Sequence, residues 1–200
     1  MRLVFSDTGT EFPEVRAFTC RYAEWLKAEF PDLEIVFEII RPKEGWNFKR
    51  VCEEKGFPIL SKDTADKIHK LRHGKLGERY RNYLLHGDER GKFGMLAARW
   101  QYLADREATT FDISSACYKI LKTEPFQRYR RRTGCYPVIG ITQDESFRRK
   151  NQYRHTGCNV YEGTTVKSQP IAFWTRQDVL RFKEENRIPI CSVYGNVIRK

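Results

Sequence analysis

Three short polar segments of the sequence carry side chains that could bind a charged ligand. The first segment, Ser6-Asp7-Thr8-Gly9-Thr10-Glu11-Phe12, contains a carboxylate that can accept hydrogen bonds from a ribose or an amine. Its glycine, Gly9, would let the backbone approach a ligand closely. The same residue types also suit a turn that leads into a helix without any ligand, and taken alone the pattern favours that simpler interpretation.

The second segment runs from Gly140 to Ser146 and is followed by Arg148 and Arg149. Backbone amides at the start of a helix attract phosphate, and Arg149 could reach back to the same group. The acids Asp144 and Glu145 oppose phosphate binding unless a metal ion or an adenosine hydroxyl lies nearby. Acids at the start of a helix and bases further on also match the dipole of any ordinary helix, so both interpretations stay open.

The third segment, Ser114-Ser115-Ala116-Cys117, leads to Lys122. Lys122 is a candidate phosphate ligand, although an isolated lysine more often lies on a solvated surface. Among the four histidines only His69 and His73 have a helical spacing of four, and no further ligand completes a site, so we expect no metal ion. The six cysteines include no C-x-x-C pair, which favours ordinary packing over a zinc site.

Short apolar runs alternate with helical patterns along the chain, which predicts an α/β fold with a parallel sheet flanked by helices. We expect one domain over residues 1–200, with a helical insertion at 74–108 that has too few apolar residues for a core of its own. Thr175 with Asp178 has the spacing of a capping box. Ligands bind such sheets at the carboxyl ends of the strands. The expected strands are 2–6, 34–40, 137–141 and 171–174. The expected helices include those that begin near Pro13, Phe48, Pro125 and Asp144, together with one that Ser61 caps.

The amino-acid composition indicates which classes of protein and which kinds of partner to expect. With 40% hydrophobic residues, the chain can bury a core, yet no apolar stretch is long enough to span a membrane, so we expect a cytoplasmic protein. The formal charge of +11 favours anionic partners such as a nucleotide or a nucleic acid. Basic residues are concentrated at 128–132 and at 148–154.

Five segments, taken in order, resemble the phosphoadenosine phosphosulfate (PAPS) reductase family, and the similarity extends over essentially the whole chain. One stretch, Gly56–Lys62, has the form seen in bacterial and phage-type members. The correspondences are Asp7–Pro13 with "DTG-x-E-[FY]-P", Gly56–Lys62 with "G-x-P-x-x-S-K", Cys117–Pro125 with "C-C-x-x-x-K-x-x-P" (Tyr118 replaces the second cysteine), Glu145–Arg149 with "E-S-x-x-R", and Gln169–Val179 with "P-[IL]-x-x-W-[ST]-x-x-D-[VI]".

The resemblance implies an adenine nucleotide alpha hydrolase-like fold that binds an adenine nucleotide, either ATP or PAPS, and works in sulfur metabolism or nucleotide activation. Asp7, Thr8 and Gly9 would lie near the adenosine. The residues implied for the phosphate or sulfate side are Lys62, Lys122, Glu145, Ser146 and Arg149.

Two parts of the family pattern have no counterpart in the sequence: the phosphate loop "S-G-G-K-D-S" and the terminal cysteine motif of the reductases. We therefore expect a weak or inactive enzyme unless other segments complete a sulfonucleotide reductase or an ATP-pyrophosphatase-like site. The alternative is a non-catalytic binding or inhibitor protein that uses the scaffold to contact nucleic acid or another protein. A homodimer would suit a sheet whose edge is open beside Leu3–Phe5.

Overall fold

The computed structural model describes residues 1–91, 93–145, 157–161 and 166–195 of the chain. The chain divides into two compact units. The first unit comprises Met1–Leu3, Phe12–Glu38 and Arg128–Lys200, and the second unit comprises Val4–Glu11 and Ile39–Gln127. The sequence-based prediction of a single domain with an insertion stays a prediction.

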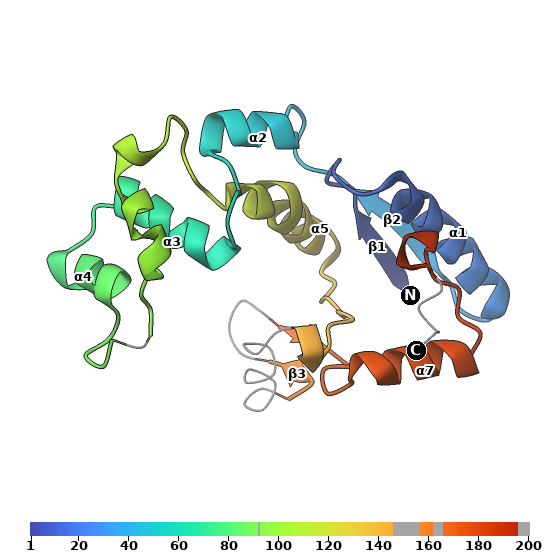
Figure 1. Ribbon diagram of the computed structural model, residues 1–200. Helices are drawn as coiled ribbons and strands as arrows, with labels where there is room; N and C mark the ends of the chain where they lie inside the picture. The colour runs from blue at the N-terminus through green and yellow to red at the C-terminus, as the bar shows by residue number, and fades with distance from the viewer. Residues whose placement is uncertain (92, 146–156, 162–165, 196–200) are drawn as a thin grey trace. The chain divides into compact units, whose positions relative to one another are not determined.

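Two strands lie within the first 40 residues and two shorter strands after residue 158, and the described elements between these pairs are helices (Figure 1). In order they are β1 (Arg2–Ser6), α1 (Pro13–Glu29), β2 (Val36–Ile40), α2 (Phe48–Lys55), α3 (Lys62–His73), α4 (Glu78–His86), the 3-10 helices η1 (Ala98–Ala104) and η2 (Arg106–Ala108), the π-helix η3 (Tyr118–Thr123), α5 (Glu124–Thr133), the 3-10 turn η4 (Gln143–Glu145), β3 (Asn159–Val160), β4 (Lys167–Ser168), α7 (Arg176–Glu185) and the 3-10 turn η6 (Ser192–Tyr194).

Strands β1 and β2 pair as a two-stranded sheet. Val36 donates its backbone N–H to Met1 O at 2.9 Å, and Asp7 donates to Ile40 O at 2.9 Å. Both strands advance in the same direction between these two bonds, so the pairing is parallel. This parallel pair among helices confirms the predicted α/β class, and β1 has the predicted bounds.

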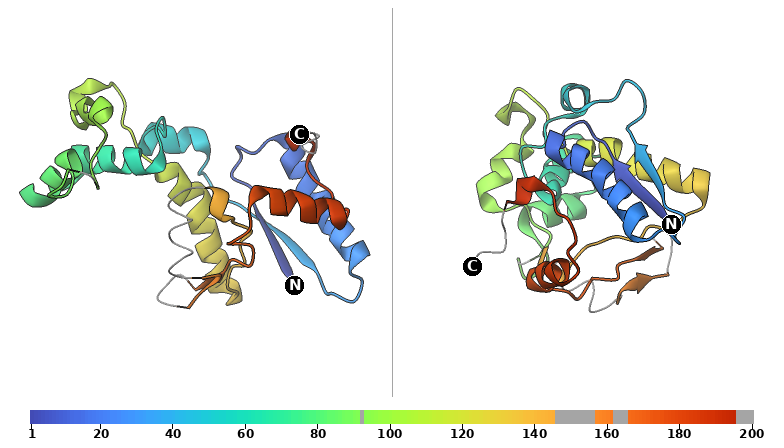
Figure 2. Two further views of the ribbon diagram at one scale, coloured as in Figure 1. Left: turned by 60° about the horizontal axis from the view of Figure 1, so that its bottom comes forward. Right: turned by 90° about the vertical axis from the view of Figure 1, so that its right-hand side faces the viewer.

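Helix α1 begins at Pro13, whose fixed φ suits the first helical turn. It ends at Glu29, immediately before Phe30-Pro31, because the residue that precedes a proline is disfavoured in the helical region. Ala23 and Leu26 are its buried residues. The turn η6, drawn in red, lies beside α1 in the views of Figure 2, and the two elements are in contact within the first unit.

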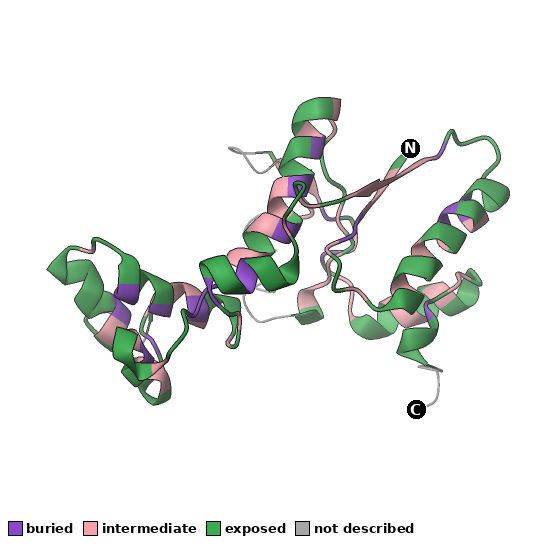
Figure 3. Cartoon of the chain, turned by 90° about the horizontal axis from the view of Figure 1, so that it is seen from above, coloured by how far each residue is buried: buried purple, intermediate pink, exposed green. Residues whose placement is uncertain are grey.

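The core of the second unit lies between α3, α4 and η1, where the buried positions of Figure 3 face one another. Side chains from residues 74–108, the segment predicted as an insertion, contribute to this core together with α3. The buried members are Ala65, Ile68, Leu71, Leu84, Leu96, Leu103 and Ile113.

Two predicted strands are wrong. Residues 171–174 form a turn, in which Ala172 N–H donates to Gln169 O and Trp174 N–H donates to Ile171 O, both at 3.0 Å. The nearest strand along the sequence is β4, which ends at Ser168 and pairs antiparallel with β3. The run 137–141 contributes only an isolated parallel bridge between Val138 and Ser168. Each run starts at or directly after a proline, Pro137 or Pro170, which has no N–H for a ladder.

The helix predicted from Pro125 begins earlier, because the π-helix η3 continues directly into α5. Pro125 is the second residue of α5 and lacks the N–H that would bond to the preceding turn. The wider π turn lies immediately before that position, and such turns are rare in proteins. The helix predicted from Asp144 starts as the 3-10 turn η4, and its continuation lies outside the described residues.

Candidate nucleotide-binding site

The carboxyl ends of β1 and β2 bring together an acid and a base. Asp7 follows β1 and Arg41 follows β2, and because the strands are parallel their ends lie at the same edge of the sheet. Arg41 Nε donates to Asp7 Oδ2 at 3.2 Å. The Asp7 side chain is 8% exposed and that of Arg41 is 56% exposed. The carboxylate is therefore held in place at the position where α/β sheets usually bind ligands.

The turn after Asp7 is fixed by its own side chains. Gly9 N–H donates to Asp7 Oδ1 at 3.2 Å, and its φ of +81° is a conformation that favours glycine. Thr8 donates twice to Glu11, from its N–H at 3.0 Å and from its hydroxyl at 2.6 Å. The structure thus brings Asp7, Thr8 and Gly9 together in one ordered turn.

Two residues at this edge were not predicted from the sequence. Arg41 is the first residue after a predicted strand, and that position was the available signal. Ser6 is the last residue of β1, and its Oγ is buried without a hydrogen-bond partner among the residues that the structure describes. A buried hydroxyl without a partner is uncommon, since most such groups are satisfied. Ser6 belongs to the first polar segment of the sequence, but the sequence did not indicate that its hydroxyl is buried.

Lys62 and Lys122 lie elsewhere in the second unit. The Lys62 ammonium is 3.9 Å from the centre of the Tyr118 ring, within the range of a cation–π contact. Lys122 is exposed on η3, the π-helix that begins at Tyr118. Tyr118, which replaces the second cysteine of the family pattern, therefore contacts the ammonium group of Lys62, a predicted phosphate-binding residue.

Glu145 belongs to the first unit, where its Oε1 accepts a hydrogen bond from Thr142 N–H at 3.2 Å. The neighbouring Asp144 accepts a bond of 2.9 Å from the N–H of Arg176, the first residue of α7. The two carboxylates that argued against phosphate binding thus bond to backbone N–H groups. The predicted site residues Ser146 and Arg149 lie outside the described residues.

The pKa values of two further side chains, Cys52 and His69, are shifted from their ordinary values. Burial raises the pKa of the Cys52 thiol, and the nearby Cys117 and Glu53 raise it further, which disfavours a reactive thiolate. Partial burial lowers the pKa of His69, and the neighbouring His73, with ring centroids 4.8 Å apart, lowers it further. Within the described ranges, no three His, Cys, Asp or Glu side chains are placed to hold a metal ion, and no helix is both long and apolar enough to cross a membrane.

A family model described as "Phosphoadenosine phosphosulfate reductase domain" matches residues 89–200, which is more than half of the chain. The chain therefore belongs to the PAPS reductase family. Among solved structures it is similar to the PAPS reductase of Candida auris in a phosphate complex, with 14% sequence identity and a TM-score of 0.48. That alignment covers 100% of this chain and 68% of the other. No curated protein matches the chain.

Proposed function

We propose that the protein binds an adenine nucleotide, ATP or PAPS, and that Asp7, Thr8 and Gly9 contact its adenosine. The observation that carries this proposal is the buried Asp7 carboxylate, which is paired with Arg41 at the carboxyl edge of a parallel sheet. Membership of the PAPS reductase family supports the choice of ligand.

The Asp7 carboxylate is the group that would accept hydrogen bonds from the ligand. A carboxylate offers about four lone-pair directions, so each oxygen can accept more than one hydrogen bond. Oδ1 accepts the Gly9 N–H and Oδ2 accepts Arg41 Nε. A ribose hydroxyl or the adenine amino group of the ligand would donate to this carboxylate. The guanidinium of Arg41, whose side chain is 56% exposed, would donate to a nearby phosphate.

The phosphate or sulfate side of the ligand would meet cationic side chains. Lys62 and Lys122 are the proposed contacts in the second unit, and Tyr118 would orient the ammonium of Lys62 through the cation–π contact. Glu145, Ser146 and Arg149 remain proposed members of the site on the strength of the family resemblance.

Isothermal titration calorimetry of the folded protein tests the proposal with three ligands: ATP, PAPS and adenosine 3′,5′-bisphosphate. Saturable heat with at least one of them is the expected result, and inorganic phosphate at the same concentration is the control. Binding of phosphate alone with the same affinity would show that the adenosine is not recognised. No heat with any of the three ligands, on protein whose circular dichroism shows a folded chain, would overturn the proposal.

A further inference from the structure

Positive charge is concentrated on the last turns of α5. Four arginines occupy positions 128, 130, 131 and 132 of the first unit. One or two cations near the carboxyl end of a helix are explained by its dipole. Four are more than that explanation needs, because like charges three or four positions apart repel one another and destabilise a helix.

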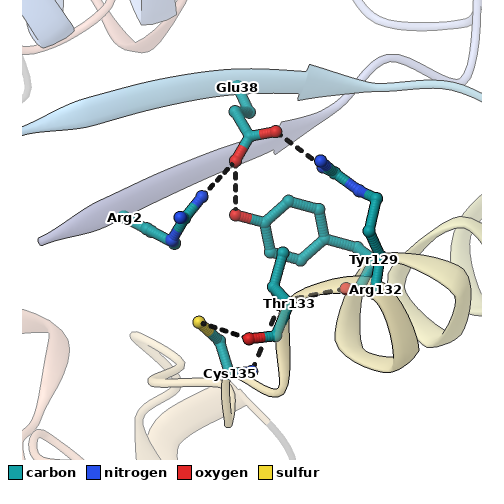
Figure 4. Close-up of polar contacts among 6 residues, drawn as sticks. All are labelled: Arg2, Glu38, Tyr129, Arg132, Thr133 and Cys135. Carbon is teal, nitrogen blue, oxygen red and sulfur yellow. Dashed lines mark hydrogen bonds and ion pairs between the residues drawn. The ribbon is translucent and has the colours of Figure 1, made fainter.

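The helix is oriented by a contact with β2, shown in Figure 4. Tyr129 is buried, and its hydroxyl donates to Glu38 Oε1 at 2.7 Å. A helix advances about 100° per residue, so Arg131 points about 200° away from Tyr129. Arg131 is accordingly exposed on the side of α5 that faces away from this contact.

Glu38 does not neutralise the cluster. It accepts hydrogen bonds from Arg2 at 2.9 Å and from Arg132 at 2.6 Å in addition to the bond from Tyr129 (Figure 4). The bonds from Arg132 and Tyr129 hold the pKa of Glu38 below its usual value, so the carboxylate is charged at neutral pH. One negative charge between the guanidinium groups of Arg2 and Arg132 leaves these three side chains with a net positive charge.

An exposed aromatic ring adjoins the arginines. Gly134 ends the helix with a φ of +69°, and its N–H donates to Arg130 O at 2.8 Å. The chain reverses there, which places the guanidinium of Arg130 4.9 Å from the centre of the Tyr136 ring. Tyr136 is 59% exposed, so much of its ring is available to a ligand.

We propose that these residues form a surface that binds single-stranded nucleic acid. The arginines would contact successive phosphates, while a base would stack on the Tyr136 ring. The surface, which we call the basic-aromatic surface, consists of Arg128, Arg130, Arg131 and Tyr136, whereas Arg132 is bonded to Glu38. None of these residues is a proposed adenosine contact, so the proposal of a nucleic-acid surface is tested independently of the proposed function.

The exposed tyrosine selects nucleic acid over other polyanions. Any polyanion, such as an acidic peptide, a sulfated polysaccharide or an anionic membrane, would use the arginines, but a nucleic acid adds a base for each phosphate. A flipped or unpaired base has a π-face that stacks on such a ring, whereas the bases of a duplex are stacked on one another. A single strand is thus the ligand that uses both parts of the surface.

Fluorescence anisotropy with a labelled 20-nucleotide oligo(dT), measured across a salt series, tests the proposal. We expect Arg131→Glu to weaken binding about 10-fold or more at low salt and to reduce the slope of log K against log salt by about 0.7 for each phosphate that the variant no longer binds. Tyr136→Ala should weaken binding about 5-fold to 100-fold, the range seen for loss of one stacked base. The matched controls are Arg21→Glu, an exposed arginine on α1 with the same change of charge, and Tyr161→Ala, which removes another exposed ring.

Both controls should change the affinity less than 2-fold, and thermal melting should show that every variant is folded. Absence of oligonucleotide binding by the unmodified protein at 50 mM salt would overturn the proposal. Equal losses in Arg131→Glu and Arg21→Glu would also overturn it, because net charge alone would then explain the binding. An unchanged affinity of Tyr136→Ala, together with equally tight binding of heparin, would identify a general polyanion surface instead.

Discussion

Tyr129 of α5 donates a 2.7 Å hydrogen bond to Glu38 of β2 across 91 residues of sequence. Arg132 and Arg2 bond to the same carboxylate, so one side chain of β2 joins β1 and α5 within the first unit. Because these bonds favour the charged carboxylate, the pKa of Glu38 is lowered. The stability that this network adds is therefore present above about pH 4.5, the ordinary value, and is lost as the pH falls through the lower pKa of the folded state.

Tyr129→Phe should destabilise the protein by about 1 kcal/mol, since the substitution removes one partly buried hydrogen bond and leaves the ring in place. For a chain of this length, that loss lowers Tm by about 2–4 °C. Differential scanning calorimetry measures the shift. Tyr136→Phe is the control, because its hydroxyl lies on an exposed side chain, and an equal shift in both variants would show that the bond to Glu38 adds no stability.

Gly56→Ala should be more damaging than Gly134→Ala. Both glycines have positive φ, +98° and +69°, so each substitution introduces backbone strain. A Cβ at Gly56 would lie 2.8 Å from the backbone oxygen of Asp112, whereas a Cβ at Gly134 would meet no atom within 4 Å. Urea unfolding should show a loss of about 1 kcal/mol for Gly134→Ala and about 2–4 kcal/mol for Gly56→Ala. Equal losses would mean that the contact with Asp112 relaxes without cost.

The stability of the protein should fall on mild acidification because of His69. The folded state lowers the pKa of His69 below the ordinary value of 6.5, so the unfolded chain binds the proton first. The free energy of unfolding therefore decreases as the pH falls below about 6.5, and it stops decreasing once the folded His69 is also protonated. Urea midpoints between pH 7.5 and 5 measure this effect.

His69→Gln should flatten that part of the pH profile, whereas substitution of the exposed His86 by glutamine should leave it unchanged. An identical acid-induced decrease in His69→Gln and the unmodified protein would show that other groups are responsible.

Local sequence patterns predicted those elements whose signals lie within a few residues. Thr175 and Asp178 form both hydrogen bonds of the predicted capping box, with Asp178 N–H donating to Thr175 Oγ1 at 3.2 Å and Thr175 N–H donating to Asp178 Oδ2 at 2.8 Å. Strand β1 was predicted correctly because an apolar run ends sharply at Asp7-Thr8-Gly9. The strand expected at 171–174 failed because an apolar run after Pro170 cannot be told from a buried turn by hydrophobicity alone.

Features that depend on distant partners were beyond the sequence. The predicted ligand-binding residue Asp7 lies in the turn that the local sequence indicated. Its ion pair with Arg41 joins residues 34 positions apart, so it could be predicted only by knowing that β1 pairs with β2. The π-helix from Tyr118 has no local signature, and the position of Lys62 over Tyr118 depends on how α3 and that helix pack. The unpartnered Ser6 hydroxyl likewise follows from burial and not from residue type.

The affinity of Asp7→Asn for adenosine 3′,5′-bisphosphate, measured by calorimetry beside Asp32→Asn, tests the central proposal most directly. Asp32 is exposed, so the two variants make the same chemical change with and without the proposed contact. Loss of a hydrogen bond to a charged group should weaken binding about 10-fold or more in Asp7→Asn, while Asp32→Asn should match the unmodified protein. Equal affinities in all three proteins, each shown to be folded by thermal melting, would contradict the assignment of the adenosine to the turn at Asp7.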